Sequence, residues 1–315
     1  MSKAKLAIAL STLVATVVWA VPMIGAAHQL VRGTSVPSAT SMDPIVLRDD
    51  RDHGLLAKGW INGAGPFVFV IDTGAGASII SRRVVSDARL QVTKSKTPLV
   101  GGLSTSPITS DQETRINGLA LGKPGNRVPG SVVAAVAANL PQAIDGILDP
   151  TEVFSPFGYT VDFPNRELRV FEASSHGLNV NQQPRDGAVV RWMREGGSHR
   201  PFVKLGDGSL ALIDTGSAFG LALNEQQVVT KRKTAPRAKD SRTSQDLGGG
   251  RVQSHSISPQ TVHIGGLVLN GVPTDALSGA ASDTPIILGR RALFPFRITF
   301  DPVARLIAFE PAERN

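Results

Sequence analysis

The sequence predicts an all-β fold composed of two similar halves. The 315 residues include 32 Gly and 21 Pro, and only 19% are charged, a composition typical of turn-rich β proteins. Most apolar runs are short, rich in β-branched residues and bounded by Gly, Pro, Asn or Asp, which is the pattern of strands joined by turns. The sequence also repeats itself, and such repeats indicate a duplicated structural unit.

The repeat is centred on residues 67–75 and 209–217, where an apolar run leads into Asp-Thr-Gly in both copies. The other matches pair 92–98 with 229–234, 147–149 with 287–289, 154–157 with 294–296, and 167–171 with 305–309. The spacing between the Asp-Thr-Gly motif and the later apolar pair is almost the same in both copies. Two homologous lobes are therefore expected, at residues 45–172 and 189–312.

The segments outside the repeat are polar. Residues 173–188 show no apolar period and are expected to link the two lobes. Residues 28–44 form a second polar linker ahead of the first lobe. Within the lobes, short helices are expected at residues 132–140, an alanine-rich run, and at residues 224–229.

The N-terminus has the pattern of an export segment. Lys3 and Lys5 precede an uncharged run at residues 6–27 that ends in small residues. This pattern predicts a secretory signal at residues 1–27, cleaved near Ala27. The alternative is an uncleaved membrane anchor, because the run is just long enough to span a bilayer. Both interpretations place the rest of the chain outside the cytoplasm, in the periplasm or secreted.

Composition excludes several kinds of chemistry. The chain has no Cys, which excludes thiol nucleophiles, disulfide scaffolds and Cys-ligated metals. Its six His show no paired ligand spacing, so no metal or other cofactor is expected. Neither a phosphate-binding loop at Gly248-Gly249-Gly250 nor a Gly-x-Ser-x-Gly elbow is present. The basic run at residues 231–242 lacks interleaved aromatics, which favours a solvated loop over nucleic-acid binding.

The paired Asp-Thr-Gly motifs indicate acid–base chemistry. A single motif is typical of a turn after a strand. Two copies, each at the end of a strongly apolar run, place Asp72 and Asp214 where burial makes a carboxylate costly. A pseudo-twofold arrangement would bring the two carboxyls about 3 Å apart, where they share one proton. One Asp could then act as a base toward a bound water and the other as an acid toward a carbonyl oxygen.

At these residues the chain resembles the aspartic proteases. Both Asp-Thr-Gly motifs and Ile287-Leu288-Gly289 match, and glycine-rich flap candidates follow each motif at Gly101, Gly102, Gly248 and Gly249. Ala75 is typical of the retroviral-type motif, and the only tyrosine, Tyr159, lies far past the position of the pepsin flap tyrosine. The resemblance is to a fused, bilobal, retropepsin-like protease of an exported bacterial type. It implies two β-barrel-like lobes of the pepsin/retropepsin type with the active cleft between them.

The same resemblance implies an activity and a set of site residues. Asp72 and Asp214 would be catalytic, supported by Thr73, Gly74, Thr215, Gly216 and Ser217. The implied activity is aspartic-type endopeptidase, acting on protein or peptide substrates without a metal or cofactor. A monomer is expected, because tethering raises the effective concentration of one lobe for the other. The alternative is a non-catalytic module of the same fold that binds extended peptides.

The chain departs from the family pattern at one position and differs between its copies at another. Asp149 stands where the second copy has Gly289, so we expect an irregular strand crossing in the first lobe. Ala75 corresponds to Ser217, whose hydroxyl is expected to donate to Asp214 and lower its pKa. The shared proton would then reside on Asp72.

Overall fold

The computed structural model describes residues 42–101, 103, 108–173, 177–195, 198–232, 241–245 and 251–312. The expected signal segment at residues 1–27 and almost all of the linker at residues 28–44 lie outside this set. Within the described part of the chain, no helix has the length and apolar character needed to cross a membrane.

The described residues are mostly β-strands with four short helices, which confirms the predicted all-β class. The first half contains β1 (Ile45–Val46), β2 (Arg48–Asp50), β3 (Gly54–Ile61), β4 (Ala64–Ile71), β5 (Ser78–Ser81), α1 (Arg82–Asp87), β6 (Val92–Gly101), β7 (Ile108–Ile116), β8 (Leu119–Leu121), β9 (Val132–Ala137), β10 (Gly146–Leu148), α2 (Pro150–Val153), β11 (Gly158–Asp162) and β12 (Glu167–Phe171). The second half contains β13 (Ala188–Arg191), β14 (Phe202–Lys204), β15 (Leu210–Asp214), β16 (Leu221–Asn224), α3 (Glu225–Arg232), β17 (Ser241–Gln245), β18 (Arg251–Ile264), β19 (Leu267–Ser278), β20 (Ile286–Gly289), α4 (Arg290–Leu293), β21 (Phe296–Asp301) and β22 (Leu306–Pro311).

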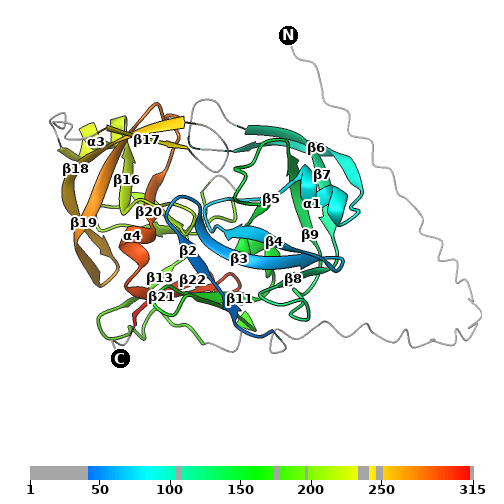
Figure 1. The fold of residues 1–315 in the computed structure, drawn as a ribbon. Helices are drawn as coiled ribbons and strands as arrows, with labels where there is room; N and C mark the ends of the chain where they lie inside the picture. The colour runs from blue at the N-terminus through cyan, green and yellow to red at the C-terminus, as the bar shows by residue number, and fades with distance from the viewer. Residues whose placement is uncertain are drawn as a thin grey trace, which may run out of the picture. The chain divides into compact units, whose positions relative to one another are not determined.

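Each half builds a sheet of its own. The first sheet has nine strands in the order β2-β3-β4-β10-β5-β9-β7-β6, with β8 paired to β3. The second has seven strands in the order β14-β15-β20-β16-β19-β18-β17. Figure 1 shows most strands of the first half on the right and the corresponding strands of the second half on the left.

The strands around the two Asp-Thr-Gly motifs pair in the same way in both halves. β10 runs parallel to β4 and antiparallel to β5, and β20 runs parallel to β15 and antiparallel to β16. The expected irregular crossing in the first half is therefore wrong. The physical reason is that Asp149 lies just beyond β10, where its Oδ1 accepts a hydrogen bond from Thr151 N–H at 2.9 Å and caps α2.

A third sheet is shared between the halves. Its order is β1-β12-β11-β21-β22-β13, three strands from each half, with β11 and β21 antiparallel at the junction. Tyr159 on β11 stacks on Phe300 on β21, with ring centroids 4.8 Å apart. The Thr160 and Thr299 hydroxyls are hydrogen bonded at 3.0 Å across the same junction. One hydrophobic core consequently contains residues of both halves.

The two expected helices had different outcomes. Residues 132–140 do not form a helix: β9 occupies Val132–Ala137 between β5 and β7, and pairing to two neighbours overrides the helix propensity of alanine. The helix expected at residues 224–229 is confirmed as α3. Asn224 and Gln227 exchange hydrogen bonds at 2.8 and 2.9 Å at its start, in the manner of a capping box.

One part of the sequence repeat was aligned wrongly. Residues 92–98 belong to β6, whereas residues 229–232 belong to α3. The counterpart of α3 is α1, since each helix directly follows the strand after its motif, β16 or β5. The shared Val-Thr-Lys letters therefore do not mark equivalent positions.

Candidate active site

The two Asp-Thr-Gly turns are joined by a reciprocal hydrogen-bond network. The N–H of Thr73 donates to Thr215 Oγ1 at 3.0 Å, and the N–H of Thr215 donates to Thr73 Oγ1 at 3.1 Å. Each hydroxyl also donates to a carbonyl of the opposite half, Thr73 to Ile213 O at 2.6 Å and Thr215 to Ile71 O at 2.8 Å. Both threonines are fully buried, so these four bonds hold the two turns together without competition from water.

The same turns bring the two carboxyls together. Asp72 Oδ1 accepts from the N–H of Gly74, and Asp214 Oδ1 accepts from the N–H of Ser217, both at 2.8 Å. A Cβ at Gly74 would lie 2.6 Å from Cγ of Asp214, and a Cβ at Gly216 would lie 2.5 Å from Cγ of Asp72. Each glycine therefore lies directly against the carboxyl of the other half, where no side chain would fit.

The electrostatic environment of the pair is asymmetric. Burial, followed by repulsion from Asp214, raises the pKa of Asp72 well above its ordinary range. Burial also raises the pKa of Asp214, but hydrogen bonds from Ser217, Asp72 and Gly216 and the positive charge of Arg290 oppose that increase. The hydrogen bond between the two carboxyls favours the proton on Asp72 and the charge on Asp214.

Ser217 supports Asp214 differently from the expectation. Its backbone N–H, and not its hydroxyl, donates to Asp214 Oδ1. The hydroxyl oxygen instead accepts from the N–H of Phe219 at 3.3 Å. The expected direction of asymmetry agrees with the pKa shifts, but the proposed cause was wrong, because a backbone donor needs no serine at this position.

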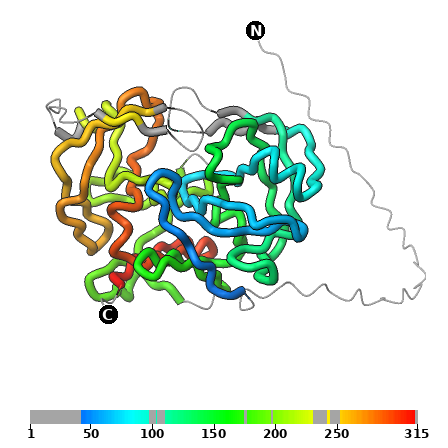
Figure 2. Tube along the Cα trace, in the orientation of Figure 1, coloured from blue at the N-terminus to red at the C-terminus, as the bar shows by residue number. Residues whose placement is uncertain are grey.

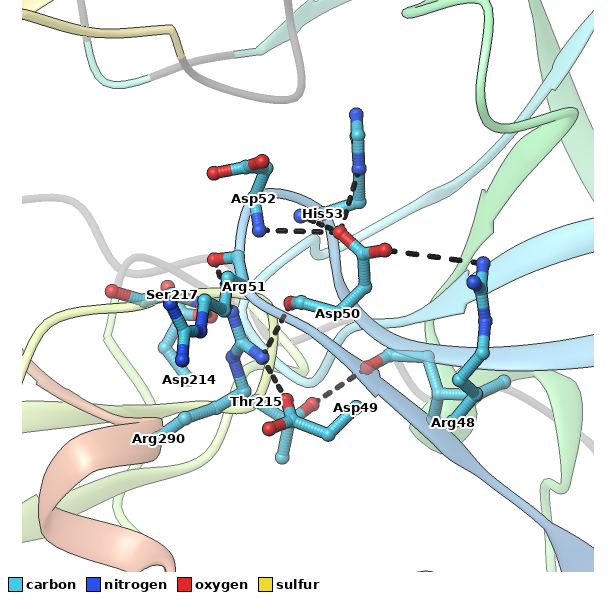
Figure 3. Close-up of polar contacts among 11 residues, drawn as sticks. Arg48, Asp49, Asp50, Arg51, Asp52, His53, Asp214, Thr215, Ser217 and Arg290 are labelled. Carbon is cyan, nitrogen blue, oxygen red and sulfur yellow. Dashed lines mark hydrogen bonds and ion pairs between the residues drawn. The ribbon is translucent and has the colours of Figure 1, made fainter.

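The sequence analysis did not identify Arg290, which lies close to Asp214 (Figure 3). This first residue of α4 is 2% exposed, and its guanidinium contacts Asp49 and donates to the carbonyl oxygens of Asp50 at 2.8 Å and Arg51 at 3.1 Å. Asp50 in turn contacts the His53 ring at 2.8 Å. The sequence feature that could have drawn attention to Arg290 is its place directly after Gly289, where the first copy has a proline.

Of the flap candidates, the structure places only Gly101, at the end of β6 in a hairpin with β7. Gly102, Gly248 and Gly249 lie outside the described residues. Leu103, two residues after Gly101, contacts the second half: its carbonyl accepts from the N–H of Ala281 at 3.2 Å. Its side chain packs on a cluster formed by Ala222, Val252, Leu277 and Ile287. The sequence offered no signal for this contact.

Comparison with known families adds an independent finding. Residues 57–148 match the model of an aspartyl protease family, from β3 through Asp72 to the end of β10. The match supports an aspartic protease family for this chain. The match does not reach the second motif at Asp214. The equivalence of that motif to the first is supported by the hydrogen-bond geometry described above. No curated protein matches the chain.

Proposed function

We propose that this protein is a bilobal, retropepsin-like aspartic endopeptidase in which Asp72 and Asp214 form the catalytic dyad. The observation that supports this most strongly is the reciprocal Thr73–Thr215 network, which holds two buried carboxyls against each other. The aspartyl protease match to residues 57–148 supports the same class of reaction.

The asymmetry of the pair suggests a role for each carboxyl. Asp214, the more readily ionised group, accepts a proton from the attacking water, while protonated Asp72 donates its proton to the carbonyl oxygen of the scissile bond. Water oxygen bonds to the carbonyl carbon and gives a neutral tetrahedral diol. Asp214 then gives its proton to the leaving nitrogen while Asp72 takes a hydroxyl proton from the diol, and the carbon–nitrogen bond breaks. The products are one carboxylic acid and one amine, and the dyad again holds a single proton.

The alternative is a peptide-binding module without catalysis. Asp149 is the feature that favours it, because a third buried carboxyl next to Asp72 departs from the family's glycine. In either role, we propose a monomeric, exported protein with residues 1–27 removed or retained as an anchor. Mass spectrometry of the N-terminus of protein recovered from outside the cytoplasm distinguishes removal from retention, and a full-length cytoplasmic chain would refute export.

Digestion of a peptide library tests the catalytic proposal. We expect cleavage by the wild type and its loss in Asp72→Asn and Asp214→Asn, with folding checked by thermal melting. Asp162→Asn is a matched control, since Asp162 is a buried carboxylate that caps a turn at Asn165 in the shared sheet. Retained cleavage in either dyad variant would refute the mechanism. A wild type that binds a pepstatin-type mimic but cleaves nothing would support the binding module.

A further inference from the structure

A third carboxyl is buried behind the proposed dyad. Asp149 has no exposed surface. Its Oδ1 accepts from the N–H of Thr151, but its Oδ2 is buried and makes no hydrogen bond to any described residue. Burying a charged carboxylate oxygen without a hydrogen-bond donor costs free energy, so this environment favours the protonated form of Asp149. A charge kept there despite that cost calls for a functional explanation.

Asp149 is connected to Asp72 through one peptide unit. The N–H of Asp72 donates to Leu148 O at 3.0 Å, and the parallel register pairs Leu148 with Ile71. In the second half, the same register extends one pair further and sets Asp214 opposite Gly289. Asp149 therefore occupies, relative to Asp72, the place that Gly289 occupies relative to Asp214.

Only the first half has room for an acid at this place. A Cβ at Gly289 would lie 2.6 Å from Phe219 O and 2.8 Å from Ser217 Oγ. The first half accommodates the buried side chain of Asp149, and it has Ala75 where the second has Ser217, so one of these contacts, the one with the hydroxyl, is missing there. The two halves thus differ in charge, with an acid behind Asp72 and the buried Arg290 near Asp214.

We propose that Asp149 is a positioning residue that keeps the shared proton of the dyad on Asp72. The proposal rests on the proposed function of Asp72 and Asp214 as that dyad. Ionised Asp149 opposes the appearance of a second negative charge on Asp72, while Arg290 favours the negative charge on Asp214. Once Asp149 is ionised, the two effects act in the same direction and favour Asp72 as the acid and Asp214 as the base.

The titration behaviour of the surrounding groups is consistent with this role. Burial raises the pKa of Asp149 to about 7, and repulsion by Glu152 contributes to the increase. The charge of Asp149 in turn raises the pKa of Asp72 and of the Tyr159 hydroxyl. Asp149 therefore ionises near neutral pH, and the shared proton would be retained to higher pH than the dyad alone allows.

The test compares Asp149→Asn with the wild type. Asn keeps the shape and the capping oxygen but cannot carry the charge. Carboxyl ¹³C NMR follows the titration of Asp72, whose resonance is identified by its absence in Asp72→Asn. We expect the pH at which Asp72 titrates to fall by roughly half a unit or more in Asp149→Asn. The alkaline limb of the pH profile of kcat/KM should shift to lower pH by a similar amount, with KM little changed.

Asp301→Asn is the matched control, because Asp301 is a buried carboxylate that accepts from the N–H groups of Val303 and Ala304 in the shared sheet. It should leave the titration of Asp72 unchanged. Asp149→Gly, which copies the second half, provides a second variant. An unchanged Asp72 titration, or failure of both Asp149 variants to fold, would overturn the proposal. A shifted titration in a protein that cleaves no peptide would instead support the coupling and refute the proposed function.

Discussion

The two halves share one arrangement of strands but differ directly behind their carboxyls. In both, a strand parallel to the Asp-bearing strand ends beside it, and a one-turn helix follows. The first half has Asp149-Pro150 at this place and the second has Gly289-Arg290. The comparison teaches that strand pairing positions the carboxyls, whereas their proton affinities depend on a few neighbouring residues that vary without disturbing the pairing.

The two helices also differ in what they contact. Asp149 caps its own helix and remains within the first half. Arg290 instead reaches the other half, where it contacts the end of β2 and the residue that follows it, at residues 49–51. Figure 2 shows this blue segment extending from the first half toward the second. Asp149 thus adds a charge within its own half, whereas Arg290, the residue after the counterpart of Asp149, joins the halves.

The largest difference between the halves should appear in the pH dependence of stability. Because the pKa of Asp149 is raised from 3.8 to about 7, its contribution to stability is fully present below about pH 4 and is lost as pH rises to about 7. The lost contribution is at most roughly 4 kcal/mol. Urea denaturation across this range should therefore show that the free energy of unfolding of Asp149→Asn increases relative to that of the wild type as pH rises. A constant difference between the two proteins would contradict the prediction.

The Thr network should be the part in which the halves are equivalent. Thr73→Ala leaves the buried N–H of Thr215 and the carbonyl of Ile213 without their partner, and Thr215→Ala does the same to Thr73 and Ile71. Each substitution should cost roughly 3 kcal/mol, and the two costs should be similar. Chemical denaturation measures both, with Thr73→Ser as the control that keeps the hydroxyl. Clearly unequal costs would show that the network is not symmetric in energy.

Arg290 should contribute both to stability and to the charge on Asp214. Arg290→Gln leaves Asp49 and two carbonyls without the guanidinium, and we expect a cost of roughly 2 kcal/mol, since Asp49 is partly exposed. The pKa of Asp214 should also rise, because the positive charge that opposes its increase is lost. Arg297→Gln is the control, an exposed ion pair with Glu310 for which less than about 1 kcal/mol is expected. Equal effects of the two substitutions would argue against a special role for Arg290.

The smallest effect is expected at Ser217. Since the bond to Asp214 comes from the backbone N–H, Ser217→Ala should change stability by less than about 1 kcal/mol and leave the pH–activity profile in place. Thermal melting and a kcat/KM profile measure the two quantities. A shift of the pH–activity profile would indicate that the Ser217 hydroxyl does contribute to the difference in pKa between Asp72 and Asp214.

The sequence was sufficient for the fold class and for the pairing of the two motifs. The apolar runs before Asp72 and Asp214, together with their repetition, predicted two buried turns of the same kind, and the structure brings these turns together. Long-range contacts were not predictable, because they depend on tertiary packing: Arg290 with Asp49, and Leu103 with Ala281. Helix propensity misled at residues 132–140, where two neighbouring strands determine the conformation.

The shared sheet has a consequence for how the two halves could come to differ. A detached first half would expose the edge of β11. A second copy of the same half could cover that edge, but in such a homodimer every residue would be present in both halves. Any acid behind one carboxyl would then stand behind both. Joining the halves in one polypeptide lifts this restriction, because the same edge is covered by a sequence that is free to diverge. Different residues behind the two carboxyls are therefore a property that fusion makes available and that the sequence of a homodimer could not encode.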